Sequence, residues 1–382
     1  MSWLLTESWR KGLCNTMDKI TVGFIGLGLI GGSIARAMKK FRTDCYLMAY
    51  SHTTATLKEA IDARVIDVAL AEHDPRFSEC DYIFLCAPVT TNLSYLPFLK
   101  EIIKPSCIVT DVGSVKGEIH REVQRLGMIR NFIGGHPMAG SEKTGFSNST
   151  DYLLENAYYV VTPESEIEIS ALSDFVELVR SLKAIPMVLT YEEHDYVTAA
   201  VSHLPHIVAA TLVNTLEKLD TPEEYMKMIA AGGFKDITRI ASSSPVMWQQ
   251  ICASNQEQIS RVLDAYIRAL VQAKYLVDHQ RMDDIYQMFD SAKNYRDSLP
   301  ETKSPASRMF ILYCDLYDEA GGIAAVTTLL AEKDINIRNI GIIHNREFEE
   351  GVLRIEFYQP EACERAKTVL EENSYRVHLP KN

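Results

Sequence analysis

The stretch Gly23-Phe24-Ile25-Gly26-Leu27-Gly28-Leu29-Ile30-Gly31-Gly32-Ser33 decides the fold of the N-terminal part of this chain. An apolar strand runs into three glycines with the spacing G-x-G-x-x-G, and a helical pattern follows at once. The first glycine of such a motif permits a tight turn, the second lets a pyrophosphate approach the backbone, and the third lets the helix pack on the strand. The predicted dinucleotide-binding residues are Gly26, Gly28, Leu29, Ile30 and Gly31.

Short apolar runs alternate with helical patterns over residues 18–166, with further runs at 45–51, 81–88 and 107–113. This order predicts βαβ units and a Rossmann-like, doubly wound parallel sheet in an α/β domain. Ala87 and Pro88, which end the third run, are assigned to the same cofactor site.

The residues that would choose between NAD and NADP follow the second apolar run. The acid expected about 20 residues after the glycines is missing, and Ser51 follows Tyr50 in its place. Small hydroxyls and His52 could accept a 2′-phosphate, although no arginine stands beside them. An ordinary turn that caps the next helix explains these residues equally well, so the motif leaves both cofactors open.

His136 lies within Gly134–Lys143, a glycine-rich segment that we expect to be a loop. Glycines remove side-chain bulk where a ligand approaches, and histidine is well suited to proton transfer near neutral pH. Together with a dinucleotide site, this pattern indicates a redox enzyme.

Ser114 follows another predicted strand, at the edge where open α/β sheets place ligand contacts. It could bond the substrate or the nicotinamide ribose. A serine before a helix is equally often an N-cap, and the segment alone does not separate these interpretations.

Four polar side chains recur every fourth residue at His194, Thr198, Ser202 and His206. On one helix they would form a polar stripe among apolar neighbours, which a polar ligand would satisfy. Histidines bonded inside the core are the alternative. A metal site is disfavoured because no third ligand has suitable spacing, and we expect none.

Arg239 follows the glycine pair 232–233 and could hold a carboxylate through two parallel hydrogen bonds. A salt bridge to a neighbouring acid is the simpler interpretation of this segment alone.

Composition narrows the function classes. The 382 residues carry a formal net charge of -12, which argues against a nucleic-acid or membrane-surface partner. Eight cysteines without a C-x-x-C pair indicate neither zinc nor a disulfide framework, so we expect reduced thiols and a cytoplasmic protein. Residues 1–17 look like a disordered extension, and translation could begin at Met1 or Met17.

The remaining chain predicts two further domains. Residues 167–297 have helical periodicity apart from a short run at 185–189, and their long apolar helices could pair in a homodimer. Residues 298–306 have linker composition. Residues 307–382 follow a βαββαβ order, which predicts a small α+β domain.

Five motifs, GLGLIGGS, DVGSVKG, GGHPMAGSEKTG, HDYVTAAVSHLPH and GGFKDITRIA, resemble in order and spacing the prephenate dehydrogenases of the TyrA family. The resemblance spans residues 18–297, and the middle three motifs are specific to that family. The tail, with Asp318-Glu319-Ala320-Gly321-Gly322 before its first helix, resembles an ACT regulatory domain.

The resemblance implies oxidative decarboxylation of prephenate to 4-hydroxyphenylpyruvate in tyrosine biosynthesis, with hydride passed to NAD or, as an alternative, NADP. It implies that His136 takes the proton of the ring hydroxyl, that Ser114 bonds both this hydroxyl and His136, and that Arg239 holds a substrate carboxylate. The further substrate-binding residues implied by position are His194, Ser202, His206, Ser141 and Glu142.

The ACT resemblance implies feedback regulation by tyrosine, which would bind near Asp318, Gly321, Gly322 and Ile323; the alternative is a domain that only aids assembly. An arogenate dehydrogenase would perform the same chemistry on an amino substrate. A nicotinamide-sensing regulator without turnover is the alternative from another class.

Overall fold

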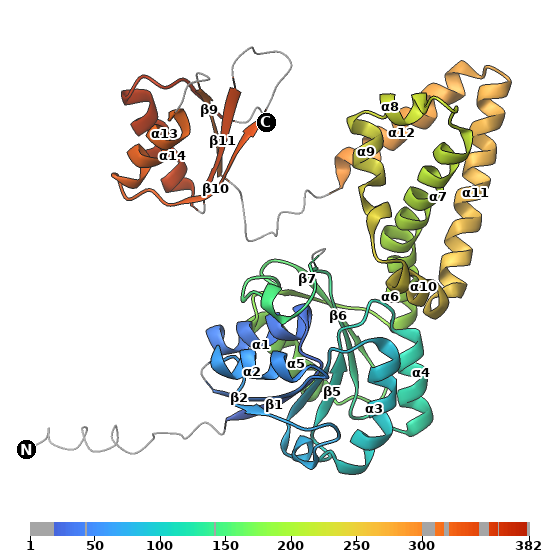
Figure 1. The fold of residues 1–382 in the computed structure, drawn as a ribbon, viewed down its shortest axis with the longest axis vertical. Helices are drawn as coiled ribbons and strands as arrows, with labels where there is room; N and C mark the ends of the chain where they lie inside the picture. Colours follow the sequence, from blue (N-terminus) through green and yellow to red (C-terminus); the bar gives the residue numbers. More distant parts are fainter. Residues whose placement is uncertain are drawn as a thin grey trace, which may run out of the picture. The chain divides into compact units, whose positions relative to one another are not determined.

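The computed structural model describes residues 19–42, 44–140, 143–299, 310–316, 321–343, 351–357 and 359–379. The chain divides into two compact units, residues 1–287 and 288–382, which are described separately below (Figure 1).

A five-stranded parallel sheet of order β3-β2-β1-β4-β5 forms the base of the first unit. The strand order reverses beside β1, which confirms the predicted doubly wound sheet and places its switch point after the glycine motif. The strands are β1 (Ile20–Ile25), β2 (Cys45–Tyr50), β3 (Val68–Ala69), β4 (Tyr82–Leu85) and β5 (Ile108–Asp111). The connecting helices are α1 (Leu29–Phe41), α2 (Thr54–Asp62), η1 (Pro75–Glu79), α3 (Val89–Ile102) and α4 (Gly117–Leu126).

Two hydrophobic cores lie on the two faces of this sheet. Phe84 of β4 packs with residues of α1, whereas its neighbours Ile83 and Leu85 pack with residues of α3 and α4. Alternate strand residues face opposite sides, so the continuous apolar runs of β1 and β4 suit a sheet covered by helices on both faces (Figure 1).

Three more strands, β6 (Ile133–Pro137), β7 (Tyr158–Pro163) and β8 (Ile185–Val188), form a second sheet of order β6-β7-β8. A parallel bridge between Val109 and Phe132 joins β5 to the start of β6. His136 pairs with Val160 of β7. The prediction of a loop from Gly134 was therefore wrong for Gly134–Pro137, which form a strand.

Packing inside the protein, and not the approach of a ligand, explains why position 134 is a glycine. A Cβ atom at this position would lie 2.7 Å from Nε2 of His120, which is buried and bonded to Thr162. Steric contact inside the protein therefore explains this glycine, contrary to the expectation from the sequence.

The helix α5 (Ile169–Ser181) belongs to the sheet region and not to the helical region that follows it. Its residues Phe175, Leu178 and Val179 are buried in the core shared with β1 and β6. Since β8 also pairs with β7, the boundary expected at 166/167 moves to about residue 189.

From Tyr191 onwards the first unit is helical in its described part, as expected. Its elements are α6 (Tyr191–Thr198), the π-helical turn η3 (Ala199–His203), α7 (Leu204–Leu219), α8 (Tyr225–Ile229), α9 (Gly232–Thr238), η4 (Arg239–Ser242), α10 (Pro245–Ser254), α11 (Gln256–Asp278) and α12 (Met282–Ser298). The last of these, α12, runs across the boundary into the second unit.

The π-helical turn breaks the expected regular stripe. The N–H of Leu204 donates to the carbonyl of Ala199, five residues earlier. Pro205 has no N–H and its ring would crowd the carbonyl four residues before it, which favours a wider turn here. The extra residue turns His203 towards the same side as Thr198 and Ser202.

The second unit has the predicted βαββαβ order, in one antiparallel sheet β10-β11-β9-β12. Alternate residues such as Leu312 and Leu353 pack against Val326 and Leu370 of the two helices. Its elements are β9 (Phe310–Leu316), α13 (Gly322–Ala331), β10 (Ile337–Ile343), β11 (Gly351–Phe357), α14 (Pro360–Glu372) and β12 (Val377–His378).

Candidate active site

The glycine turn between β1 and α1 has the geometry that a dinucleotide requires. Gly26 has φ +93°, and a Cβ atom there would lie 2.7 Å from the backbone nitrogen of Ala87. A Cβ atom on Gly31 would lie 2.6 Å from the carbonyl oxygen of Gly26. Gly28, in contrast, has no atom within 4 Å of a Cβ position. The first and third glycines are thus required by the fold, and the second leaves open space for a pyrophosphate.

The N-terminus of α1 completes this cradle. Its cap, Gly28, provides no side-chain hydrogen bond and the first turn holds no acid, so the N–H groups of Leu29 and Ile30 can point to an anion. Pro88 caps α3 across the switch point. Ser51 follows β2 directly and is half-buried.

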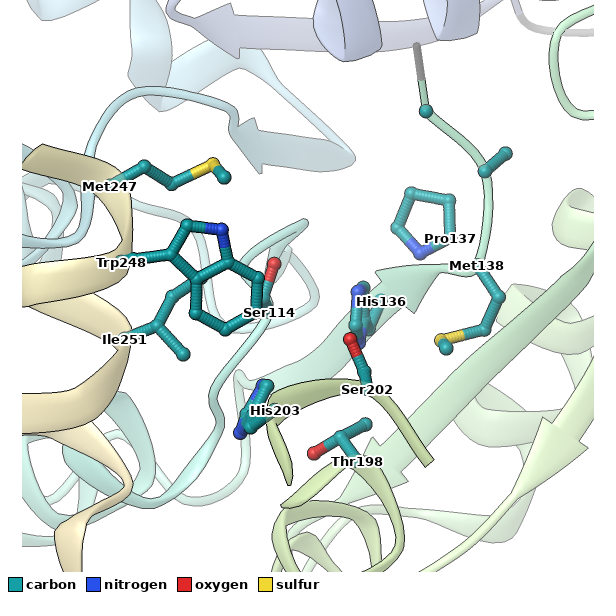
Figure 2. Close-up of a pocket in the computed structure, with 12 residues that line it drawn as sticks. Ser114, His136, Pro137, Met138, Thr198, Ser202, His203, Met247, Trp248 and Ile251 are labelled. Carbon is teal, nitrogen blue, oxygen red and sulfur yellow. The ribbon is translucent and has the colours of Figure 1, made fainter. Parts of the chain in front are cut away.

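A cavity of about 260 Å³ lies between β6 and the helical region (Figure 2). Figure 2 shows Met247, Trp248 and Ile251 of α10 on one side and His136, Pro137 and Met138 on the other. The lining residues are Ser114, His136, Pro137, Met138, Ala139, Gly140, Thr198, Ser202, His203, Met247, Trp248 and Ile251.

Three residues predicted from the sequence, Ser114, His136 and Ser202, meet at this cavity. His194 does not line it, because its side chain is fully buried behind His136. The positions predicted at Ser141 and Glu142 lie outside the described residues.

His136 presents a neutral imidazole to the cavity. Burial lowers its pKa well below the ordinary value of 6.5, and the nearby groups His194 and Lys116 lower it further. The ring is therefore unprotonated near neutral pH, which is the form that a general base needs. Its Nδ1 lies 2.8 Å from Nε2 of His194.

Asp195 connects the helical region to the loop that carries Ser114. One carboxylate oxygen accepts the N–H of Lys116 at 2.8 Å and the other accepts the N–H of Gly117 at 2.7 Å. The first oxygen also lies 2.8 Å from Nδ1 of His194. Burial alone would raise the pKa of Asp195, but the hydrogen bonds from His194 and the two backbone groups hold it below its usual value.

Lys116 connects the same loop to β6. It is fully buried, pairs with the carboxylate of Asp111, and donates to the carbonyl of Gly135 at 2.7 Å. Asp111 in turn accepts the N–H of Gly113 at 2.9 Å. These bonds hold the loop against the strand of His136, although neither residue of this ion pair was predicted as a site residue.

Ser114 is not a helix cap. The helix α4 begins at Gly117 and its cap is Lys116, so the N-cap interpretation was wrong. Among the described residues, the hydrogen bond recorded for the His136 ring runs to His194 and not to Ser114. Ser114 lines the cavity, where its hydroxyl can form a hydrogen bond with a ligand.

His203 and Trp248 line the cavity and were not predicted as site residues. Burial lowers the pKa of His203 to about 4, and its Nδ1 lies 3.2 Å from the amide nitrogen of Asn255. An amide nitrogen donates, so Nδ1 accepts and Nε2 of His203 carries the proton. The indole Nε1 of Trp248 is buried and has no hydrogen-bond partner among the described residues. The one sequence signal for the position of His203 was Pro205, because a proline inside a continuous helical pattern indicates an irregular turn just before it.

His206 and Arg239, which were predicted to bind the substrate, do not line the cavity. The ring of His206 stacks on Trp248 with 3.9 Å between the centroids. Burial lowers the pKa of His206, and the charge of Arg239 contributes to this. The side chain of Arg239, at the start of η4, is exposed.

A metal is not suggested by the part of the chain that the structure describes, since it contains no cluster of three potential ligands. Seven cysteines, all those within the described ranges, are free thiols.

A dinucleotide-binding sheet and a cavity with a neutral histidine at its edge together define a dehydrogenase of the Rossmann class. Two family models match the chain: the nucleotide-binding domain of prephenate dehydrogenase over residues 34–188 and its dimerization domain over residues 190–291. The chain belongs to the prephenate dehydrogenase family.

Individual relatives agree with this assignment. Prephenate dehydrogenase of Bacillus subtilis is 36% identical over 356 residues, which cover 92% of this chain and 96% of that protein. The crystal structure of prephenate dehydrogenase from Aquifex aeolicus with hydroxyphenyl propionate and NAD+ is 30% identical, covers 74% of this chain and 99% of that one, and has a TM-score of 0.69. Arogenate dehydrogenase of Synechocystis is 28% identical over 73% of this chain and 99% of that one, with a TM-score of 0.68.

Proposed function

We propose that this protein oxidises and decarboxylates prephenate to 4-hydroxyphenylpyruvate in tyrosine biosynthesis. The observation that carries the proposal is that His136 is a neutral base on the wall of the cavity. The loop of Ser114, which also lines this cavity, follows a strand of the dinucleotide-binding sheet. Family membership supports the same reaction.

The reaction needs a base at the ring hydroxyl. The hydroxyl proton passes to His136 while the hydrogen on the same carbon leaves as hydride, and the bond to the ring carboxylate breaks to release carbon dioxide. The electron pair of that bond makes the ring aromatic and leaves a phenolate oxygen, and His136 returns the proton to this oxygen to give the phenol. NAD, the cofactor of this family fold, accepts the hydride when bound.

Four other side chains hold the substrate. The hydroxyls of Ser114 and Ser202 and the free N–H of Trp248 offer hydrogen bonds to its oxygens. Arg239, on η4 next to His206, holds a carboxylate when the site is filled.

The cofactor is NAD rather than NADP in this proposal. The glycine turn suits either cofactor, and Ser51 supplies neither an acid for the ribose hydroxyls nor a positive charge for a 2′-phosphate. The choice of NAD is supported by the similar structure from Aquifex aeolicus, which was solved with NAD+.

The protein acts as a cytoplasmic homodimer in this proposal. The helical stretch Tyr191–Leu219 has the length and hydropathy of a membrane span, and only 22% of its most apolar window is buried inside the protein, so much of its apolar surface is exposed. Its first part carries the buried polar groups of His194 and Asp195, which a lipid environment would not suit. Together with exposed apolar residues of α11 such as Leu270 and Val271, the exposed face fits the dimerization domain that the family model describes.

The second unit is an ACT domain that binds tyrosine and lowers activity. Gly321, with φ +97°, is the N-cap of α13, and the first turn of this helix has no acid and no side-chain cap. The N–H groups of Gly322 and Ile323 can therefore meet a carboxylate. Asp318, assigned to the same site, lies outside the described residues.

One assay tests the proposal. The full-length protein is given prephenate or arogenate with NAD or NADP, and formation of reduced nicotinamide is followed by its absorbance. Turnover of prephenate with NAD supports the proposal. A preference for arogenate identifies the alternative enzyme, and cofactor binding without turnover of either substrate identifies a sensor.

A further inference from the structure

Asp195, His194 and His136 form a line of hydrogen-bonded side chains that ends at the cavity. Oδ1 of Asp195 lies 2.8 Å from Nδ1 of His194, and Nε2 of His194 lies 2.8 Å from Nδ1 of His136. His194 is fully buried and Asp195 is 6% exposed, so water does not compete for these bonds.

The backbone partners of Asp195 decide where the protons lie. Its two oxygens accept the N–H groups of Lys116 and Gly117, so the carboxylate is ionised and acts only as an acceptor. Nδ1 of His194 must then carry the proton that it shares with Asp195. A neutral His194 has no proton on Nε2, and this atom can only accept.

It follows that the proton between the two rings belongs to His136. We infer that Asp195 and His194 are positioning residues that fix His136 as the tautomer with its proton on Nδ1 and a bare Nε2. This inference rests on the proposed function, because the bare Nε2 is the atom that would receive the proton of the ring hydroxyl.

The same line stabilises the product of that transfer. When Nε2 of His136 gains the proton, the ring becomes an imidazolium that still donates through Nδ1 to His194. A charged donor makes a stronger hydrogen bond than a neutral one, so the interaction strengthens as the reaction proceeds. No proton has to move beyond His136. Asp195 also fixes the backbone at Lys116, two residues after Ser114. It therefore helps to place Ser114 as well as His136 at the ring hydroxyl of the substrate.

Two variants of the full-length protein test the inference. His194→Phe keeps a planar ring but removes the acceptor for Nδ1 of His136, so we expect kcat to fall roughly 10²-fold or more with KM for prephenate within about threefold of wild type. His194→Gln places an amide oxygen near the former Nε2, and we expect it to recover most of the lost kcat. A purely structural role would not make activity follow the acceptor in this way.

A spectroscopic measurement covers the case in which His194→Phe fails to fold. Nitrogen-15 spectra of ring-labelled wild-type protein, assigned by the signal lost in His136→Asn, report which nitrogen of His136 carries the proton. A proton on Nδ1 supports the inference, and a proton on Nε2 overturns it. His194→Phe with near-normal kcat, beside an inactive His136→Asn, also overturns it. Failure of the proposed function looks different, since the wild type would then not turn over prephenate at all.

Discussion

A Cβ atom on Gly135 would lie 2.7 Å from the hydroxyl oxygen of Tyr159, the residue on β7 beside the partner of His136. It would also lie 2.7 Å from the carbonyl oxygen of Asp111 on β5. Both neighbours are buried, so neither can yield easily. Gly135 therefore sets the distance between β6 and the strand that leads to Ser114.

Gly135→Ala should displace β6 and with it His136. Forcing a methyl group into a packed core costs about 1–3 kcal/mol, so we expect a lower Tm and a lower kcat. Gly233→Ala is the control, because Gly233 does not line the cavity and has no atom within 4 Å of its Cβ position. Equal Tm and kcat values for the two variants would show that β6 tolerates the displacement.

The pH dependence of kcat/KM should reveal the lowered pKa of His136. The base works when it is unprotonated, and burial moves its pKa below 6.5. Activity should therefore hold as pH falls from 8 to 6.5 and decline only below that range. The measurement is kcat/KM for prephenate from pH 8 to well below pH 6.5 in buffers of constant ionic strength. An acid limb centred at pH 7 or above would assign the essential base to another group.

Arg239→Lys should act mainly on KM. Lysine keeps the charge but not the two parallel donors of a guanidinium, so we expect KM for prephenate to rise about tenfold with little change in kcat. Arg268→Lys on α11, also exposed, controls for the general change of charge geometry. If KM is the same in both variants, Arg239 serves a local salt bridge instead.

The glycine turn was predictable because its chemistry is local. Spacing alone identified Gly26, Gly28 and Gly31, and the alternation of patterns identified the parallel sheet. His136 could be found for the same reason, as a histidine inside a short motif. Its place in a strand was hidden, because Gly134, Gly135 and Pro137 are poor strand formers and only pairing with β7 makes β6 a strand.

The rest of the site depends on contacts that no local period encodes. Asp195 meets Lys116 across 79 positions of the chain, and this contact gives His194 its role behind His136. The stripe of four residues assumed a regular helix, whereas the π-helical turn brings His203 to the cavity instead of His206. The sequence therefore located the elements of the site more reliably than the side chains that face it.

Removal of the second unit should separate regulation from chemistry. All the cavity residues precede Leu299, so a chain ending there should keep its kcat for prephenate. We expect tyrosine to inhibit the full-length protein and not this truncated form, as measured by activity against tyrosine concentration. Equal sensitivity of both forms would mean that tyrosine competes in the active site, and the regulatory role of the unit would be abandoned.

The most direct test of the account is the activity of His136→Asn. Asparagine keeps a polar side chain of similar size but cannot take a proton, so we expect kcat for prephenate to fall by about two to four orders of magnitude. The affinity for NAD should stay near wild type, and His279→Asn, at an exposed histidine, should keep full activity. A near-normal kcat for His136→Asn would contradict the central claim that His136 is the base.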